Sequence, residues 1–129
     1  MPEKITRAFD ACEYAQLMGM RLQRAEGGIV SVEMDPGGKR NPAGVIHGGA
    51  VFALADQAFG IAANLGPVPQ VAVSASIQYL APATGTLTAV AARVADTPAT
   101  SLYRVEVWEE ERLVAVFHGT GYKIRKNGG

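Results

Sequence analysis

The order of apolar and polar positions predicts a short helix, a strand, a long apolar helix and four further strands. Residues 9–18 place apolar side chains at helical spacing, and Gly19 is a typical helix stop. Residues 29–34 alternate apolar and polar side chains, which is the period of a strand. Residues 48–65 are rich in Ala with Phe, Leu and Ile and predict a helix that ends near Gly66. Strand-like patterns then occupy the segments 71–80, 86–95, 102–109 and 112–124.

This order of elements favours an α+β fold. Strands joined by short turns pair antiparallel, and a single apolar helix needs a sheet to cover it. We therefore expect an antiparallel sheet of five to six strands wrapped around one long central helix, formed as a single domain over residues 1–129.

Composition and charge exclude several classes of protein. The chain has 12 basic and 12 acidic residues, and this balance argues against a nucleic-acid partner, which requires a basic surface. No apolar run is long enough to span a membrane, and no apolar signal segment follows the first residues, so we expect a cytoplasmic protein without a membrane partner. One cysteine, Cys12, and two histidines do not form a ligand set, so no metal site is expected.

Asp56 is the one formal charge between Asn41 and Ala92. It lies in the middle of the predicted long helix, where neither a terminal cap nor the helix dipole accounts for it. The residues one turn away on either side are apolar or glycine and offer no ion pair. Because so apolar a helix is expected to be buried, we expect a buried, unpaired carboxylate, which is costly and usually persists for a functional reason. The alternative is a carboxylate that is bonded to backbone or lies in a subunit contact.

A glycine pair, Gly48 and Gly49, opens the same helix after the apolar residues Val45 and Ile46. Glycine permits close approach to the backbone, and the first N–H groups of a helix have no internal partner. Such N–H groups can hold an oxyanion. The helix therefore offers an end that polarises a carbonyl group and, two turns later, a carboxylate. His47 either caps the helix start or donates a hydrogen bond in the site.

These residues closely resemble the hotdog-fold thioesterases related to the PaaI-type enzyme of phenylacetic acid degradation. The resemblance rests on NPAGVIHGG at residues 41–49, FALAD at 52–56 and VSASIQYLAPA at 73–83. It implies a sheet that wraps a central helix, with chains paired so that their sheets are continuous. A homodimer at minimum, and a homotetramer as the full assembly, are therefore expected.

The resemblance also implies roles for single residues. Asp56 would be the nucleophile or general base, and the Gly48 amide would polarise the thioester carbonyl. Asn41 and His47 would assist that carbonyl or position water. Phe52 and Phe59 bracket Asp56 and indicate a compact aromatic pocket, and the substrate-binding residues that we expect are Gly49, Phe52, Phe59, Ser74 and Tyr79.

One position departs from the family pattern. Many relatives carry Thr or Ser on the strand after the helix, where Ala72 stands in this chain. Ser74 and Ser76 lie nearby and, by simple alternation, on the same face. The sequence leaves open what replaces the missing hydroxyl group.

The function implied is hydrolysis of an acyl-CoA or aryl-CoA thioester, phenylacetyl-CoA-like or of medium chain length, to free acid and coenzyme A without a metal or redox cofactor. Two alternatives stay open: hydrolysis of thioesters on a carrier protein, and a non-catalytic acyl-CoA-binding protein of the same fold. The basic residues either contact the coenzyme A phosphates or form a solvated surface; they are Lys39, Arg40, Lys123, Arg125 and Lys126.

Overall fold

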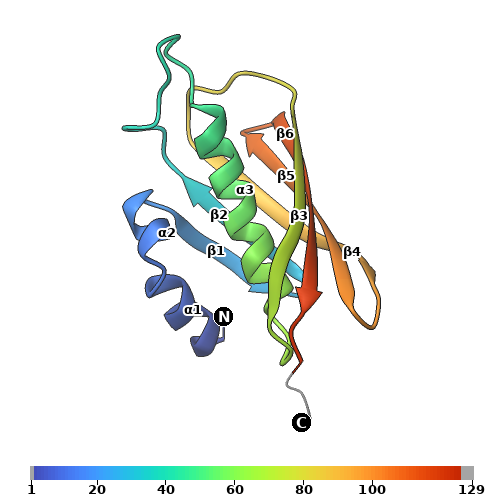
Figure 1. Ribbon diagram of the computed structural model, residues 1–129. Coiled ribbons are helices and arrows are strands. Elements are labelled where there is room, and N and C mark those ends of the chain that lie inside the picture. The colour runs from blue at the N-terminus through green and yellow to red at the C-terminus, as the bar shows by residue number, and fades with distance from the viewer. Residues whose placement is uncertain (1, 126–129) are drawn as a thin grey trace.

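A curved antiparallel sheet wraps one long helix in the computed structural model, which describes residues 2–125 (Figure 1). Within these residues the sheet has six strands in the order β1-β2-β4-β5-β6-β3. This arrangement confirms the expected α+β architecture. In chain order the elements are α1 (Glu3–Asp10), α2 (Glu13–Leu17), β1 (Arg21–Glu26), β2 (Ile29–Met34), α3 (Gly48–Ala63), β3 (Gln70–Tyr79), β4 (Leu87–Asp96), β5 (Thr100–Glu109) and β6 (Arg112–Lys123).

The long helix α3 packs one face against the concave side of the sheet. Leu54, Ala55 and Ala58 on that face have no exposed surface. Asn64 caps the end of the helix: its side-chain amide donates to the Gly60 carbonyl at 2.8 Å, and its side-chain oxygen accepts from the Gln70 N–H at 2.8 Å. These bonds give the Gly60 carbonyl at the end of the helix a hydrogen-bond donor, and they place the start of β3 beside the helix end. No helix within residues 2–125 is both long and apolar enough to cross a membrane.

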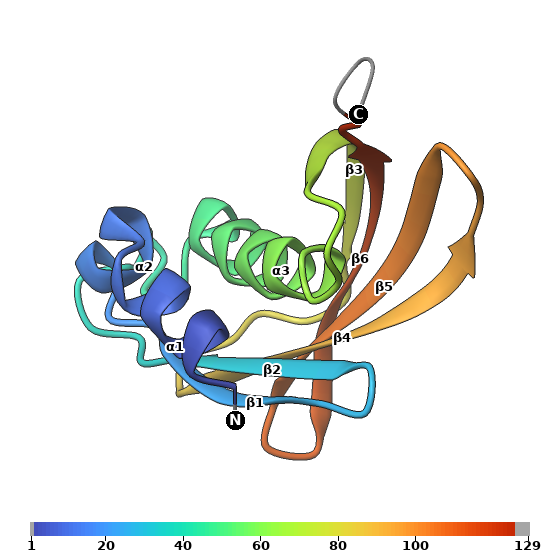
Figure 2. The same cartoon turned by 90° about the horizontal axis from the view of Figure 1, so that it is seen from below.

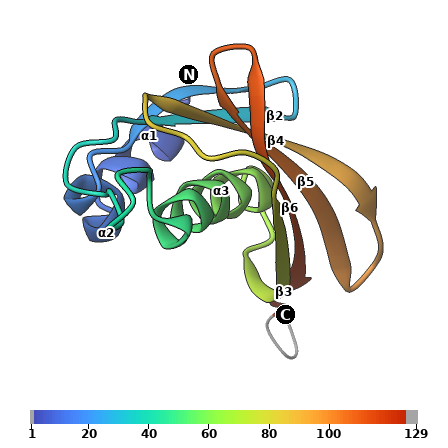
Figure 3. The same ribbon diagram turned by 90° about the horizontal axis from the view of Figure 1, so that it is seen from above.

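Two structural layers flank α3 on opposite sides. Figures 2 and 3 show α1 and α2 along one side of α3, with β3 and β6 along the other. The remaining face of α3, which carries Gly49 and Asp56, is exposed in the chain. The expectation that this helix is buried on all sides is therefore wrong for the single chain. Apolar composition alone does not show which of its faces the sheet covers.

The N-terminal helix also differs from the prediction. Instead of one helix over residues 9–18, the chain forms α1 and α2 with a break at Ala11 and Cys12. Phe9 and Ala15 are both buried, yet in one straight helix they would lie about 120° apart. The break lets both side chains reach the core. Leu17, which the helical spacing placed on the apolar face, is 79% exposed.

The strands β1 and β3 form the two edges of the sheet. The strand β1 was not predicted because its sequence RLQRAE is mostly polar, and among its residues only Ala25 is buried. It pairs with β2 alone. At the other edge, β3 pairs only with β6 among the described strands, and most of its residues are exposed.

Candidate active site

His47 is the N-cap of α3. Its Nδ1 accepts a hydrogen bond from the Gly49 N–H at 2.9 Å, and its carbonyl oxygen accepts from the Ala50 N–H at 2.9 Å. Because Nδ1 is an acceptor, the neutral ring carries its proton on Nε2, which remains available to donate. The N–H of Gly48 has no acceptor within residues 2–125. The capping bond thus uses the Gly49 amide and leaves the Gly48 amide free.

Asn41 organises the loop that enters α3. Its side-chain oxygen accepts from the N–H groups of Ala43 at 3.0 Å and Val45 at 3.3 Å, and its own N–H donates to the Val45 carbonyl at 2.8 Å. Gly44 closes this turn with a φ of 84°, a conformation that favours glycine. The amide nitrogen of the Asn41 side chain donates no hydrogen bond in the described part of the chain. It is therefore a third available donor near the helix start, after the His47 Nε2–H and the Gly48 N–H.

Tyr79 packs over the first residue of α3. Its hydroxyl donates to the Gly48 carbonyl oxygen at 2.9 Å. A Cβ atom on Gly48 would lie 3.3 Å from the phenol ring, so glycine permits this approach. Beside this contact lies a cavity of about 310 Å³ bordered by Ile46, Gly48 and Leu80.

Asp56 lies two turns further along α3 on its exposed face. The prediction of a buried carboxylate is thus wrong for the single chain, but the prediction of an unpaired one agrees with the structure: no side chain or backbone group among residues 2–125 forms a hydrogen bond or ion pair with it. Nearby protein atoms desolvate the carboxylate and raise its pKa above the ordinary aspartate value. No group of three His, Cys, Asp or Glu side chains in the same residues could hold a metal ion.

The structure does not bring Asp56 and Gly48 together within one chain. They are eight residues apart on a continuous helix, which separates them by about 12 Å along the helix axis. Each group would need a contact of about 3 Å to act on a carbonyl carbon or oxygen. One chain therefore presents two separate halves of a possible site.

The two phenylalanines that bracket Asp56 lie on the side of α3 that faces β6. The ring of Phe52 meets that of Phe117 edge-on, with centroids 5.3 Å apart. Phe59 is only 2% exposed and packs against Phe117 and Tyr103. The structure thus places Phe59 in the core, where its ring packs between α3 and the sheet, and not at an open surface beside Asp56.

A β-bulge in β3 decides where Ser74 points. Ala72 pairs with Gly121 and Ser74 with Thr120, so Val73 is an extra residue between them. Gly119 and Gly121 lie on the side of the sheet that faces α3, because a Cβ atom on Gly119 would touch Phe59. Ala72 therefore shares the helix side, whereas Ser74 lies on the opposite, outer side. The expectation that both share one face is wrong, because the bulge breaks the alternation.

Comparison with known proteins identifies the relatives of this fold and site. A family model described as "Thioesterase superfamily" matches residues 43–116. The acyl-coenzyme A thioesterase PaaI of Escherichia coli is 33% identical over 119 residues, which cover 89% of this chain and 84% of that enzyme. The structure of the E. coli PaaI protein superposes with a TM-score of 0.88 at 28% identity, covering 93% of this chain and 90% of that chain. The structure of a mutant of the phenylacetic acid degradation protein PaaI from Thermus thermophilus superposes with a TM-score of 0.82 at 32% identity. The match covers 86% of this chain and 98% of that chain.

These likenesses confirm the predicted hotdog fold, and they define the protein as a thioester hydrolase. The expected resemblance to PaaI-type enzymes is confirmed as well. The chain belongs to the thioesterase superfamily.

Proposed function

We propose that this protein hydrolyses acyl-CoA or aryl-CoA thioesters to a free acid and coenzyme A, with Asp56 as the catalytic carboxylate. The observation that carries the proposal is that α3 presents two unpaired groups of opposite character, the Asp56 carboxylate and the Gly48 N–H. The name of the E. coli relative, an acyl-coenzyme A thioesterase, supports a coenzyme A ester as the substrate.

The reaction follows from these two groups. The Gly48 N–H donates to the thioester carbonyl oxygen and stabilises the negative charge that develops there. In one route the Asp56 carboxylate attacks the carbonyl carbon, the carbon–sulfur bond breaks, and the coenzyme A thiolate leaves and takes a proton from water. Water then hydrolyses the mixed anhydride. In the other route Asp56 removes a proton from a water molecule that attacks the same carbon, the carbon–sulfur bond breaks, and the departing coenzyme A thiolate takes the proton from Asp56. The available N–H donors of Asn41 and His47 assist the carbonyl or hold the water.

The separation of these groups requires a shared site. If a Gly48 amide and an Asp56 carboxylate act on one carbonyl, they must come from two chains whose α3 helices lie antiparallel. Such a two-fold dimer contains two equivalent sites. The exposed face of α3 around Asp56 would then become covered, which would desolvate the carboxylate further and raise its pKa more.

The edge strand β3 supports this dimer. Residues 70–79 contain no charge and no proline, the features that usually protect an exposed edge from pairing. Val73 on this edge is 58% exposed. We propose that β3 pairs with β3 of a second chain and makes the two sheets continuous. On the outer face, Val71 and Tyr122 form an exposed apolar pair, which supports a further association into a homotetramer.

The test is release of free thiol from a panel of CoA esters. The Asp56→Asn variant should lose ~100-fold or more in turnover on the best substrate, the scale of a lost base or nucleophile. Asp10→Asn, which removes an exposed carboxylate from α1, is the matched control and should retain normal turnover.

Three results would contradict the proposal. Near-normal turnover by Asp56→Asn would exclude the catalytic carboxylate. Hydrolysis of the same acyl groups only when they are attached to a carrier protein would identify the carrier-protein enzyme instead. Saturable binding of CoA esters with no thiol release by the parent protein would identify a binding protein.

A further inference from the structure

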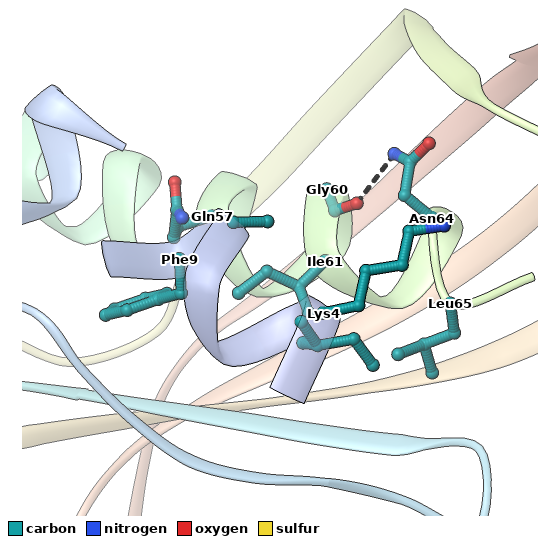
Figure 4. Close-up of a pocket in the computed structure, with 9 residues that line it drawn as sticks. Lys4, Phe9, Gln57, Gly60, Ile61, Asn64 and Leu65 are labelled. Atoms are coloured by element: carbon teal, nitrogen blue, oxygen red, sulfur yellow. Dashed lines mark hydrogen bonds between the residues drawn. The ribbon is translucent and has the colours of Figure 1, made fainter. Parts of the chain in front are cut away.

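The two ends of α3 are held by different parts of the chain. At the C-terminal end the Asn64 side chain donates to the Gly60 carbonyl, and residues of α1 line a cavity of about 240 Å³ beside it (Figure 4). At the N-terminal end the contacts come from Tyr79 and from the β3–β4 connection, by which we mean residues 80–86. Figure 1 shows this connection passing beside the first turn of α3. The Gly48 N–H, the proposed oxyanion donor, therefore lies next to a segment that is neither helix nor strand.

A backbone hydrogen bond joins the β3–β4 connection to the segment that enters α3. The Ile46 N–H donates to the Ala83 carbonyl oxygen at 2.8 Å, and both residues are buried. Ile46 precedes Gly48 by two residues, and the Tyr79 hydroxyl holds the Gly48 carbonyl oxygen on the other side. The peptide group that carries the Gly48 N–H thus lies between two fixed points. Because buried, close-packed segments shift together, a movement of Ala83 would displace this N–H.

Glu109 and Arg112, at the turn between β5 and β6, hold the β3–β4 connection on both sides of Ala83. Arg112 Nη2 donates to the Pro82 carbonyl oxygen at 2.6 Å and to one Glu109 carboxylate oxygen at 2.7 Å. The other carboxylate oxygen accepts from the Gly85 N–H at 2.6 Å. A Cβ atom on Gly85 would lie 2.7 Å from that oxygen, so this approach requires glycine. The Glu109–Arg112 pair therefore fixes the backbone directly before and directly after Ala83.

The charge of Glu109 strengthens these contacts. Its side chain is only 17% exposed, so its partners are groups of the chain. The Arg112 guanidinium holds the pKa of the Glu109 carboxyl below the ordinary glutamate value, and the N–H groups of Gly85 and Thr84 act in the same direction. The carboxyl is therefore ionised at neutral pH, and hydrogen bonds to an ionised carboxylate are about twice as strong as neutral ones. A solvated ion pair alone would stabilise the chain little, whereas this pair also binds the backbone of the connection.

We propose that the Glu109–Arg112 pair positions the Gly48 N–H for thioester hydrolysis, with Glu109 as the positioning residue. This inference rests on the proposed function. Glu109 does not touch the substrate in this arrangement: it fixes the Ala83 carbonyl, which in turn fixes the segment that enters α3. A displacement of about 1 Å caused by a change far from the chemistry can cost on the order of 100-fold in rate. Loss of the pair should therefore be visible in turnover.

The experiment is a double-mutant cycle between Glu109 and Gly48, measured as kcat and KM for the best ester of the CoA panel. Glu109→Ala should lower kcat about 10-fold and leave KM within about 2-fold, because the displaced donor acts on charge that develops in the transition state. In a Gly48→Ala background the same change should lower kcat by less than about 2-fold, since the donor is already displaced there. Glu109→Gln keeps an acceptor oxygen without the charge, and its kcat should lie between those of the parent and Glu109→Ala.

Glu106→Ala is the matched control. Glu106 is a second glutamate of β5 that pairs with an arginine, Arg104, but among residues 2–125 its carboxylate does not bind the β3–β4 connection. Its removal should leave kcat unchanged in both backgrounds.

The outcomes separate this inference from the proposed function. Unchanged kcat in Glu109→Ala, or an equal loss in the parent and the Gly48→Ala background, overturns the inference and leaves the proposed function standing. An equal loss in Glu106→Ala also overturns it. A parent that releases thiol from none of the esters overturns the proposed function and this inference with it. If Glu109→Ala fails to fold, Glu109→Gln enters the same cycle, where coupling to Gly48 supports the inference and additivity overturns it.

Discussion

The Tyr79 hydroxyl donates a hydrogen bond of 2.9 Å to the Gly48 carbonyl oxygen, while its ring occupies the space beside the Gly48 Cα. This contact joins the end of β3 to the first residue of α3, which are 31 residues apart in the chain. It also fixes the orientation of the peptide groups at the helix start, where the Gly48 N–H is free. The position of a proposed oxyanion donor therefore depends on a side chain from the edge strand.

A side chain at Gly48 should disturb this donor. In Gly48→Ala the new Cβ atom lies 3.3 Å from the Tyr79 ring, so the ring or the helix start must shift. We expect kcat to fall roughly 10- to 100-fold, somewhat less than when such a donor is removed outright. Tyr79→Phe keeps the ring and removes only the hydrogen bond, so its effect should be smaller. Steady-state thiol release measures both, and Gly37→Ala, at an uncrowded glycine, is the control. Normal kcat in Gly48→Ala would argue against its amide as the donor.

The pH dependence of the reaction should report the state of Asp56. Desolvation raises the pKa of this carboxyl, so its ionised form is reached only at a higher pH than for an ordinary aspartate, whose pKa is about 3.9. Both catalytic routes need the ionised form. The value of kcat/KM should therefore fall as the pH is lowered through an apparent pKa that lies above that of an ordinary aspartate. A profile measured with a thiol reagent suited to acid pH tests this, and an acid limb at or below the ordinary aspartate value would contradict it.

Charge on the β3 edge should separate the subunits. Val73→Lys places a lysine on the unprotected edge, which is how many proteins prevent edge pairing. We expect a monomer by size-exclusion chromatography with light scattering, and a loss of thiol release because neither half-site is complete alone. Val94→Lys is a closely matched control, since Val94 is 57% exposed and also lies at a register irregularity, but in β4. A dimer that survives Val73→Lys with full activity would place the interface elsewhere.

Complementation between two inactive chains tests the shared site itself. One chain carries Asp56→Ala, and the other carries Asn41→Ala and His47→Ala. A heterodimer contains one intact site and one doubly impaired site, so activity should return to up to about half of normal per heterodimer. Subunit exchange is verified by a mass tag on one chain. If exchange is complete and activity stays absent, each site lies within a single chain.

Much of the fold could be predicted from the sequence, because local patterns coincide with the tertiary structure there. The helix α3 was predicted to start at Gly48, and its observed end at Ala63 is two residues earlier than predicted. The strand at 29–34 matches β2, and the other predicted strands lie within two residues of β3 to β6 at each end. The polar strand β1 was missed because its own sequence has no strand signal. It is a strand because its backbone pairs with that of β2.

The candidate site could be predicted only as a set of residue types. A lone charge in an apolar helix and a glycine pair at the helix start are visible in the sequence. The sequence does not show which of the two glycine N–H groups is free. That depends on the fold, in which the His47 ring accepts a hydrogen bond from the Gly49 N–H and not from the Gly48 N–H. Similarly, Phe59 was predicted beside the substrate, and the structure places it in the core because its side of α3 faces β6.

The sequence by itself determined, to within two residues at each end, where α3 and the strands β2 to β6 lie, and it determined which helix carries the carboxylate. Helical and strand periods are local properties of the chain, which is why these elements could be read from it. Tertiary structure alone decided which face of α3 is open, which side of the sheet Ser74 occupies and what lies beside Gly60. These features depend on contacts between segments far apart in the chain, such as the bulged pairing of β3 with β6 and the packing of α1 along α3. No local pattern encodes such contacts, since each side chain acquires its neighbours only when the sheet closes around the helix.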